Sequence, residues 1–129
     1  MTNTYVTYSP PVNSSTELST VPIGTDTPAN RFCILQTEPA RTLPQIAKVP
    51  YVAFTGEASP HITYDHCVIA FLQQAGVPNV NWIKLGDIGI HGNAHFSFLE
   101  KNNLVIAAVV DRWMRDTASN STLRTIPGL

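Results

Sequence analysis

The chain has 129 residues, enough for one domain with a hydrophobic core. Only 13% of these residues are charged and the formal net charge is -1, with Lys and Arg scattered, which argues against nucleic acid as a partner. No apolar run reaches the roughly 18 residues of a membrane-spanning helix, so no membrane partner is expected. The N-terminus lacks the basic and apolar regions of a signal peptide, which leaves localisation open and favours the cytoplasm.

The first part of the chain, residues 1–28, is rich in Ser, Thr and Pro and holds few large apolar side chains. Such a segment buries too little surface to offset the entropy lost on ordering it. We therefore expect residues 1–22 to form an irregular N-terminal segment, with residues 1–20 the least ordered part of the chain.

The pattern changes after this segment. Two short apolar runs, residues 32–35 and 49–55, are bounded by polar residues and predict buried strands. Residues 65–75 repeat apolar side chains at the i, i+3 and i+4 spacing of an amphipathic helix, which Gly76 then ends. Residues 81–85 predict a third strand.

A second amphipathic helix is predicted over residues 103–114, and residues 116–129 form a polar tail. Parallel strands need crossover helices between them. The order of elements therefore predicts an α/β fold, a short parallel sheet of about three strands flanked by helices, within a domain over residues 23–115.

The two cysteines, Cys33 and Cys67, lie inside apolar segments. A free cysteine behaves as a small apolar side chain, and disulfides belong to oxidising compartments. Without a secretory signal, we expect two reduced, buried thiols rather than a disulfide.

The most informative stretch is the loop of residues 89–95, Gly-Ile-His-Gly-Asn-Ala-His, between a predicted strand and a predicted helix. Loops on a rigid scaffold can expose an imidazole to substrate, and imidazole transfers protons readily near neutral pH. This makes His95 the candidate general base, whereas His91 is expected to hydrogen-bond within the loop. His61 and His66 are expected at the surface. No histidine pair has convincing metal-ligand spacing, so neither a metal nor a cofactor is predicted.

This loop, followed by Glu100-Lys101-Asn102-Asn103, resembles a motif in the C-terminal half of α/β-hydrolase-fold serine esterases of a bacterial and fungal subgroup. The subgroup motif reads approximately Gly-Ile/Val-x-Gly-Asn-x-His and continues to Glu/Asp-Lys/Arg-Asn-Asn. Residues 49–56 are similar to the Ile-Pro strand of the family, and Glu38-Pro39 to its Glu-Pro. The resemblance covers about residues 23–114 and implies a partial α/β-hydrolase fold, with His95 as the catalytic histidine and Glu38 as the triad acid.

Two other residues compete for the role of the acid, and the nucleophile is weakly defined. Glu57 follows the next strand, where most α/β-hydrolases keep their acid, and Asp87 is a further alternative. The family serine lies about two dozen residues before its Glu, which corresponds to Ser14 here. Thr16 and a glutamate replace the two glycines that follow the family serine. The candidate nucleophile, Ser14, therefore lacks a recognisable nucleophile elbow.

The function that the resemblance implies is hydrolysis of a small carboxylic ester by a serine nucleophile, with His95 as base and Glu38 orienting it. Because the elbow and the first half of the family fold are missing, we expect a truncated or degenerate copy with little activity alone. The alternative is a non-catalytic α/β remnant or a partner-binding module. Residues 32–35 would also lose their neighbouring strand, which predicts self-association through an exposed sheet edge.

Overall fold

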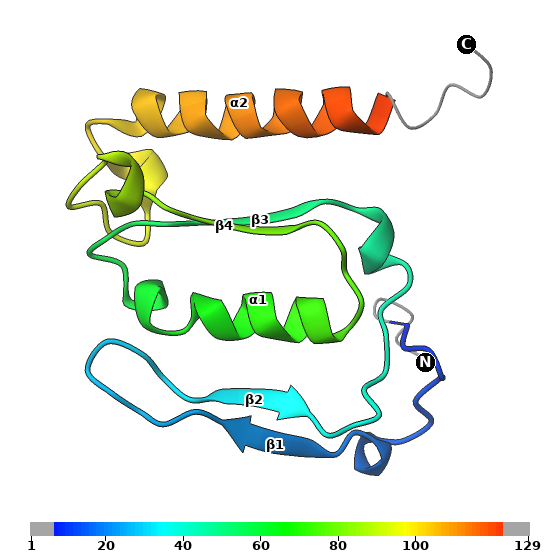
Figure 1. Ribbon diagram of the computed structural model, residues 1–129. Coiled ribbons are helices and arrows are strands. Elements are labelled where there is room, and N and C mark those ends of the chain that lie inside the picture. Colours follow the sequence, from blue (N-terminus) through cyan, green and yellow to red (C-terminus); the bar gives the residue numbers. More distant parts are fainter. Residues whose placement is uncertain (1–6, 123–129) are drawn as a thin grey trace. The chain divides into compact units, whose positions relative to one another are not determined.

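The chain folds into two compact units, residues 1–95 and residues 96–129. The structure, a computed structural model, describes residues 7–122 (Figure 1). The part of the expected irregular segment formed by residues 1–6 lies outside the described residues.

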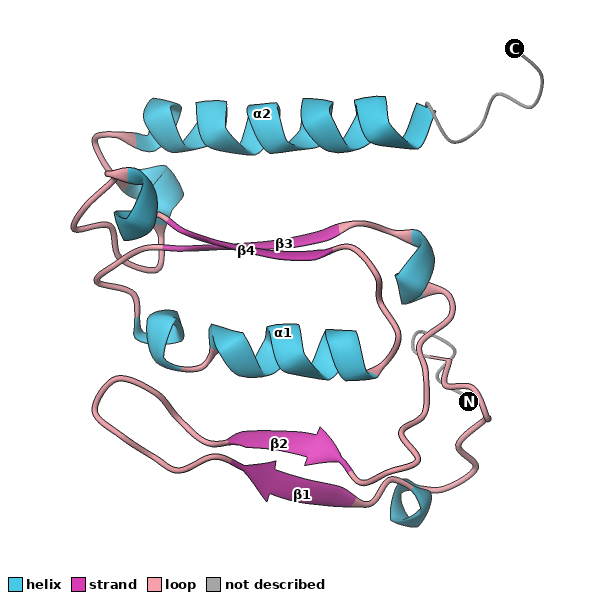
Figure 2. Ribbon diagram, viewed as in Figure 1, coloured by secondary structure: helices cyan, strands magenta, loops and turns pink. Residues whose placement is uncertain are grey.

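The first sheet is a two-stranded antiparallel hairpin, formed by β1 (Thr20–Ile23) and β2 (Cys33–Gln36) (Figure 2). The strand predicted at residues 32–35 exists as β2, but its place in the parallel sheet was wrong, because it pairs with β1 in an antiparallel hairpin. A strand with a proline at its third position fits only at the edge of a sheet, because proline cannot donate to the ladder.

The second sheet is parallel and joins β3 (Tyr51–Thr55) to β4 (Val80–Lys84), in register from Tyr51↔Val80 to Thr55↔Lys84. The helix α1 (Asp65–Gln74) connects these strands, which makes a β-α-β unit. Both strands and the helix are confirmed near their predicted bounds. The prediction of a parallel sheet of about three strands was wrong, because the strand predicted at residues 32–35 pairs in the hairpin instead. Residues 7–122 thus form a small α/β structure with two short sheets and two α-helices.

The core of the N-terminal unit forms around α1, which contacts both β2 and β4. Gly76 follows the helix with a φ of +79°, and the Val77 N–H donates to the Leu72 carbonyl at 3.0 Å, so the predicted helix stop is confirmed. The buried apolar residues of this unit are Cys33, Leu43, Leu72, Ala75, Val77 and Leu85.

A disulfide between Cys33 and Cys67 links the hairpin to α1, so the prediction of two reduced thiols was wrong. Cys33 begins β2 and Cys67 lies in the first turn of α1, and their Cα atoms are 5.0 Å apart. That separation falls within the range that a disulfide spans without backbone movement. The packing of α1 on the hairpin therefore brings together two cysteines that are distant in sequence.

The C-terminal unit contains a short 3-10 helix, η5 (Ser97–Leu99), and the long helix α2 (Asn103–Thr122). The predicted helix over residues 103–114 is confirmed, but residues 116–122 continue it instead of starting a polar tail. Two i, i+4 ion pairs, Asp111–Arg115 and Arg112–Asp116, support the added turns. Among the described residues, no helix combines the length and apolar character needed to cross a bilayer.

Candidate functional site

The carboxyl ends of β3 and β4 meet at one edge of the parallel sheet, where Thr55 pairs with Lys84. Two loops start there. Residues 56–59 follow β3 and lead to the 3-10 helix η3 (Pro60–Thr63), and residues 85–95 follow β4 through η4 (Gly86–Ile88). In open α/β sheets, this edge is where ligands and substrates bind.

The two loops are bonded to each other through their main chains. The Ala58 N–H donates to the Asn93 carbonyl at 3.0 Å, and Gly56 packs directly against that same carbonyl. Asn93 is buried at 2% exposure. This contact fixes the histidine loop against the end of β3.

Glu57, the alternative acid, is the side chain that reaches across between these loops. One carboxylate oxygen, Oε2, accepts from the Gly92 N–H at 3.1 Å and lies 3.3 Å from Nδ1 of His91. His91 therefore bonds to the other loop rather than within its own. Both side chains are exposed, so water screens the attraction between them.

His95 stacks its ring on that of His61, with centroids 4.2 Å apart and planes 5° from parallel. His61 was expected at the surface, but it is half-buried, and its Nδ1 lies 3.4 Å from Oδ1 of Asp65. The i, i+4 spacing of His61 and Asp65 at the start of a helix was a sequence signal for this pair.

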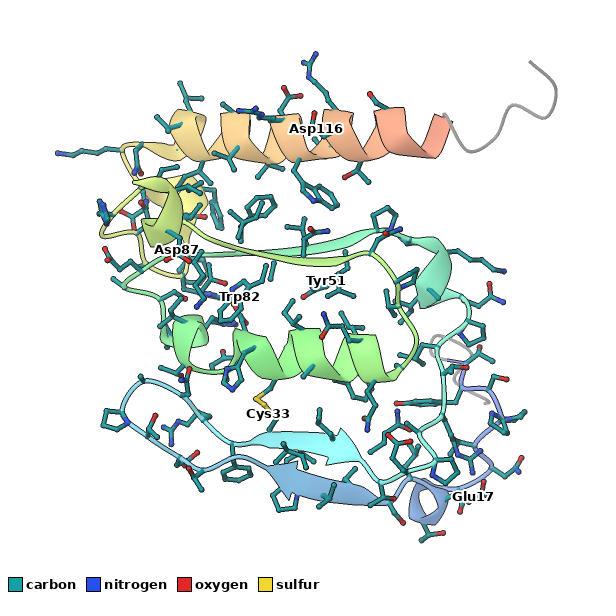
Figure 3. The ribbon with its side chains drawn as sticks, in the orientation of Figure 1. Glu17, Cys33, Tyr51, Trp82, Asp87 and Asp116 are labelled. Atoms are coloured by element: carbon teal, nitrogen blue, oxygen red, sulfur yellow. A yellow bond between two sulfur atoms is a disulfide. The ribbon has the colours of Figure 1, made fainter. Side chains whose placement is uncertain are left out.

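Asp65 is held by the buried Thr55, which bonds in turn to the half-buried Trp82. Its Oδ2 accepts from the Thr55 hydroxyl, and the same hydroxyl accepts from Nε1 of Trp82 at 2.9 Å. Thr55 is 2% exposed, and Figure 3 shows Trp82 in the space between the sheet and α1. Lys84 covers the indole, with Nζ 4.2 Å from the centroid of Trp82.

The charge of Asp65 is also felt by Tyr51 at the start of β3. Burial raises the pKa of the Tyr51 phenol, and the negative charge of Asp65 raises it further. Both effects disfavour the phenolate, the first through lost hydration and the second through like-charge repulsion.

Glu38 lies at the other end of α1. Its Oε1 accepts from Nε2 of Gln74, the last residue of that helix, at 3.2 Å, and its Oε2 accepts from the Ala40 N–H. His95 instead stacks on His61, which precedes the first turn. The helix has 10 residues and is about 15 Å long, so the structure does not bring Glu38 and His95 together.

Ser14 lies just before the 3-10 helix η1 (Ser15–Glu17), with its Oγ 2.7 Å from Oγ1 of Thr16. The Arg41 guanidinium pairs with Glu17, which places this segment near the end of β2. Figure 3 shows Glu17 on the opposite side of the N-terminal unit from Trp82 and Asp87. Ser14 is therefore not adjacent to the histidine loop, whereas Asp87 lies in η4 at the start of that loop.

One cluster of three side chains with metal-binding atoms occurs in the described part of the chain, formed by Cys33, His66 and Cys67. The two sulfur atoms are bonded to each other. Metals bind the thiolate form of cysteine, so this cluster holds no ligand set while the disulfide is intact.

The chain is similar to a protein named probable secreted lipase phiG from a fungal species (strain ATCC 74256). The two are 41% identical over 102 residues. The match covers 79% of this chain and 28% of the lipase, so the chain spans little more than a quarter of that relative. No protein-family model and no solved structure matches the chain. The identity supports a lipase- or esterase-like relationship.

Proposed function

We propose that this chain is part of a carboxylic-ester hydrolase and supplies the histidine base of its site. The observation that carries the proposal is the 41% identity to a probable secreted lipase. The edge of the parallel sheet adds support, because a carboxylate follows β3 and a histidine follows β4 at that edge. Residues 23–115 are the proposed hydrolase portion, as part of an α/β-hydrolase fold.

His95 is the proposed general base. Its imidazole takes the proton of the serine nucleophile as the hydroxyl attacks the ester carbonyl, and then returns it to the leaving alcohol. Water repeats the cycle on the acyl-enzyme. The exposure of His95 at the end of a loop is compatible with access by a substrate.

Glu57 is the proposed acid in place of Glu38. It follows the strand next to β4, and it already bonds to the histidine loop through the Gly92 N–H. Glu38 bonds instead to Gln74 at the far end of α1. A carboxylate can fix the tautomer of a catalytic imidazole only within hydrogen-bond reach, which favours the residue nearer the loop.

The chain alone is proposed to have little activity. Ser14 is the serine that the family pattern selects, but it lacks an elbow and lies away from His95. The direct test measures hydrolysis of p-nitrophenyl acetate and labelling by a fluorophosphonate probe, with Ser14→Ala beside the parent. We expect background rates and no labelling at Ser14. Turnover that is lost in Ser14→Ala would contradict this part of the proposal.

A chimera tests the roles of the base and the acid. The matched segment of the fungal lipase is exchanged for the corresponding residues of this chain, and hydrolysis of p-nitrophenyl butyrate is measured. We expect activity in the chimera, with His95→Gln and Glu57→Gln each losing about 1,000-fold or more. Glu38→Gln is the matched control, expected to retain the activity of the chimera.

Two results would overturn the assignments. Full activity in a folded His95→Gln chimera would remove the base, and a large loss in Glu38→Gln with none in Glu57→Gln would restore Glu38 as the acid. A folded but inactive chimera, next to an active lipase, would favour the alternative of a non-catalytic or partner-binding module.

A further inference from the structure

We propose that His61 and Asp65 form a positioning pair that holds the ring of His95 in one orientation. The inference rests on the proposed function, because it gives the pair a task at the proposed base. The contacts that carry it are independent of activity. They join His95 to the buried interior of the β-α-β unit.

Hydrogen bonds connect the pair to residues of the β-α-β unit. A buried carboxylate is costly unless its oxygens accept hydrogen bonds. Asp65 satisfies this condition through the Thr55 hydroxyl on one oxygen and His61 Nδ1 on the other. Thr55 is fixed in turn by the indole N–H of Trp82. The orientation of Asp65 is therefore set by groups from β3 and β4.

The orientation of His61 follows from that of Asp65. Because the carboxylate accepts at Nδ1, the ring of His61 carries its proton there and cannot turn over without losing the bond. The ring also contacts Tyr64, with centroids 4.7 Å apart. His61 thus has a fixed ring plane although its side chain is only half-buried.

The ring of His95 packs against the fixed ring of His61. His95 itself stands in an exposed loop. The near-parallel stack, with ring centroids 4.2 Å apart, favours orientations in which the His95 ring lies parallel to the ring of His61. A base must be held close to its productive geometry, and a displacement of about 1 Å can cost a hundredfold in rate. His61 is accordingly a positioning residue that acts through His95.

The test is by NMR on the whole 129-residue chain. In the parent, we expect nuclear Overhauser contacts between the ring protons of His61 and His95, assigned with His95→Gln. In His61→Leu, which removes the ring, the His95 ring protons should shift downfield as the ring-current effect is lost. His61→Phe keeps an aromatic ring and should retain most of the upfield shift. The matched control, His91→Leu, removes an imidazole from the same loop and should leave the His95 signals in place.

Absence of nuclear Overhauser contacts between the two rings in the parent would overturn the proposal. This measurement needs no variant, so the proposal can be tested even if a variant fails to fold. Unchanged His95 signals in a folded His61→Leu chain would also overturn it. In an active chimera with the fungal lipase, His61→Leu should lower kcat about tenfold to a hundredfold with KM little changed, and His61→Phe should restore much of it. Ring contacts in an inactive chimera would mean that the pair is correct and the proposed function is wrong.

Discussion

Gly56 lies so close to Asn93 that a β-carbon at position 56 would overlap the main-chain carbonyl oxygen of Asn93. The same carbonyl accepts the Ala58 N–H at 3.0 Å. The atoms that a β-carbon would meet belong to the main chain, which cannot change rotamer to make room as a side chain can. The contact between the two loops of the site therefore depends on the absence of a side chain at residue 56.

Gly56→Ala should displace the histidine loop and lower the free energy of unfolding by about 1–3 kcal/mol, the usual cost of overpacking. Urea denaturation measures this loss. The matched control is Gly86→Ala, whose β-carbon would meet the Glu57 side chain at an ordinary 3.4 Å. Equal stability of the two variants would contradict the importance of the Gly56 contact.

Thr55→Val should be strongly destabilising although it preserves the shape of the side chain. It removes the hydroxyl that bonds both Trp82 and Asp65, and leaves the buried Asp65 carboxylate and the half-buried Trp82 indole N–H without that partner. The expected cost is about 1–3 kcal/mol for each group left unsatisfied. Thr37→Val, at an exposed threonine, should stay within about 0.5 kcal/mol of the parent. Matching denaturation curves for the two variants would refute the network.

Reduction of the Cys33–Cys67 disulfide should lower the free energy of unfolding by about 2–4 kcal/mol. The bond joins residues 34 apart, so it restricts a long loop of the unfolded chain. The measurement is denaturation with and without dithiothreitol. A Cys33→Ser, Cys67→Ser double variant should match the reduced parent and be insensitive to the reductant. If dithiothreitol left the denaturation midpoint of the parent unchanged, this would argue against the Cys33–Cys67 disulfide.

Tyr51 should lower stability at alkaline pH. Its pKa is raised in the folded chain, by burial first and by Asp65 second, so the folded state holds the phenolic proton more tightly than the unfolded state. This contribution is fully present below the unfolded pKa of about 10 and is lost as pH rises through the folded pKa. The difference in ultraviolet titration between the parent and Tyr51→Phe isolates this group. A midpoint at or below the ordinary tyrosine value would contradict the expectation.

The β-α-β unit could be predicted from sequence because its signals are local. Residues 65–75 show helical periodicity, Gly76 supplies the stop, and short apolar runs mark β3 and β4. The hairpin could not be predicted in this way. Residues 20–23 form a run of only four residues that includes a proline, and their pairing with β2 is specified by tertiary contacts rather than by a pattern.

The histidine loop was visible in the sequence as a motif, but its partners were not. Glu57 and His61 lie more than 30 residues before His95, and only the parallel pairing of β3 with β4 brings them to the same edge. The disulfide was missed for the same reason, since Cys33 and Cys67 meet only when α1 packs on the hairpin. Glu38 matches the triad acid of the family motif in sequence, but its position at the far end of α1 from the histidine loop could not be predicted from that match.

The parallel register of β3 and β4 also has an evolutionary consequence. The turn at Pro78 and Asn79 enters β4 at the end of the sheet opposite the histidine loop, and both residues are exposed. A residue inserted there lengthens the turn alone, whereas one inserted within β4 shifts the following loop by about 3.3 Å relative to Glu57 and inverts the faces of the strand. Natural length variation in this segment should therefore accumulate at the turn and be purged from the strand.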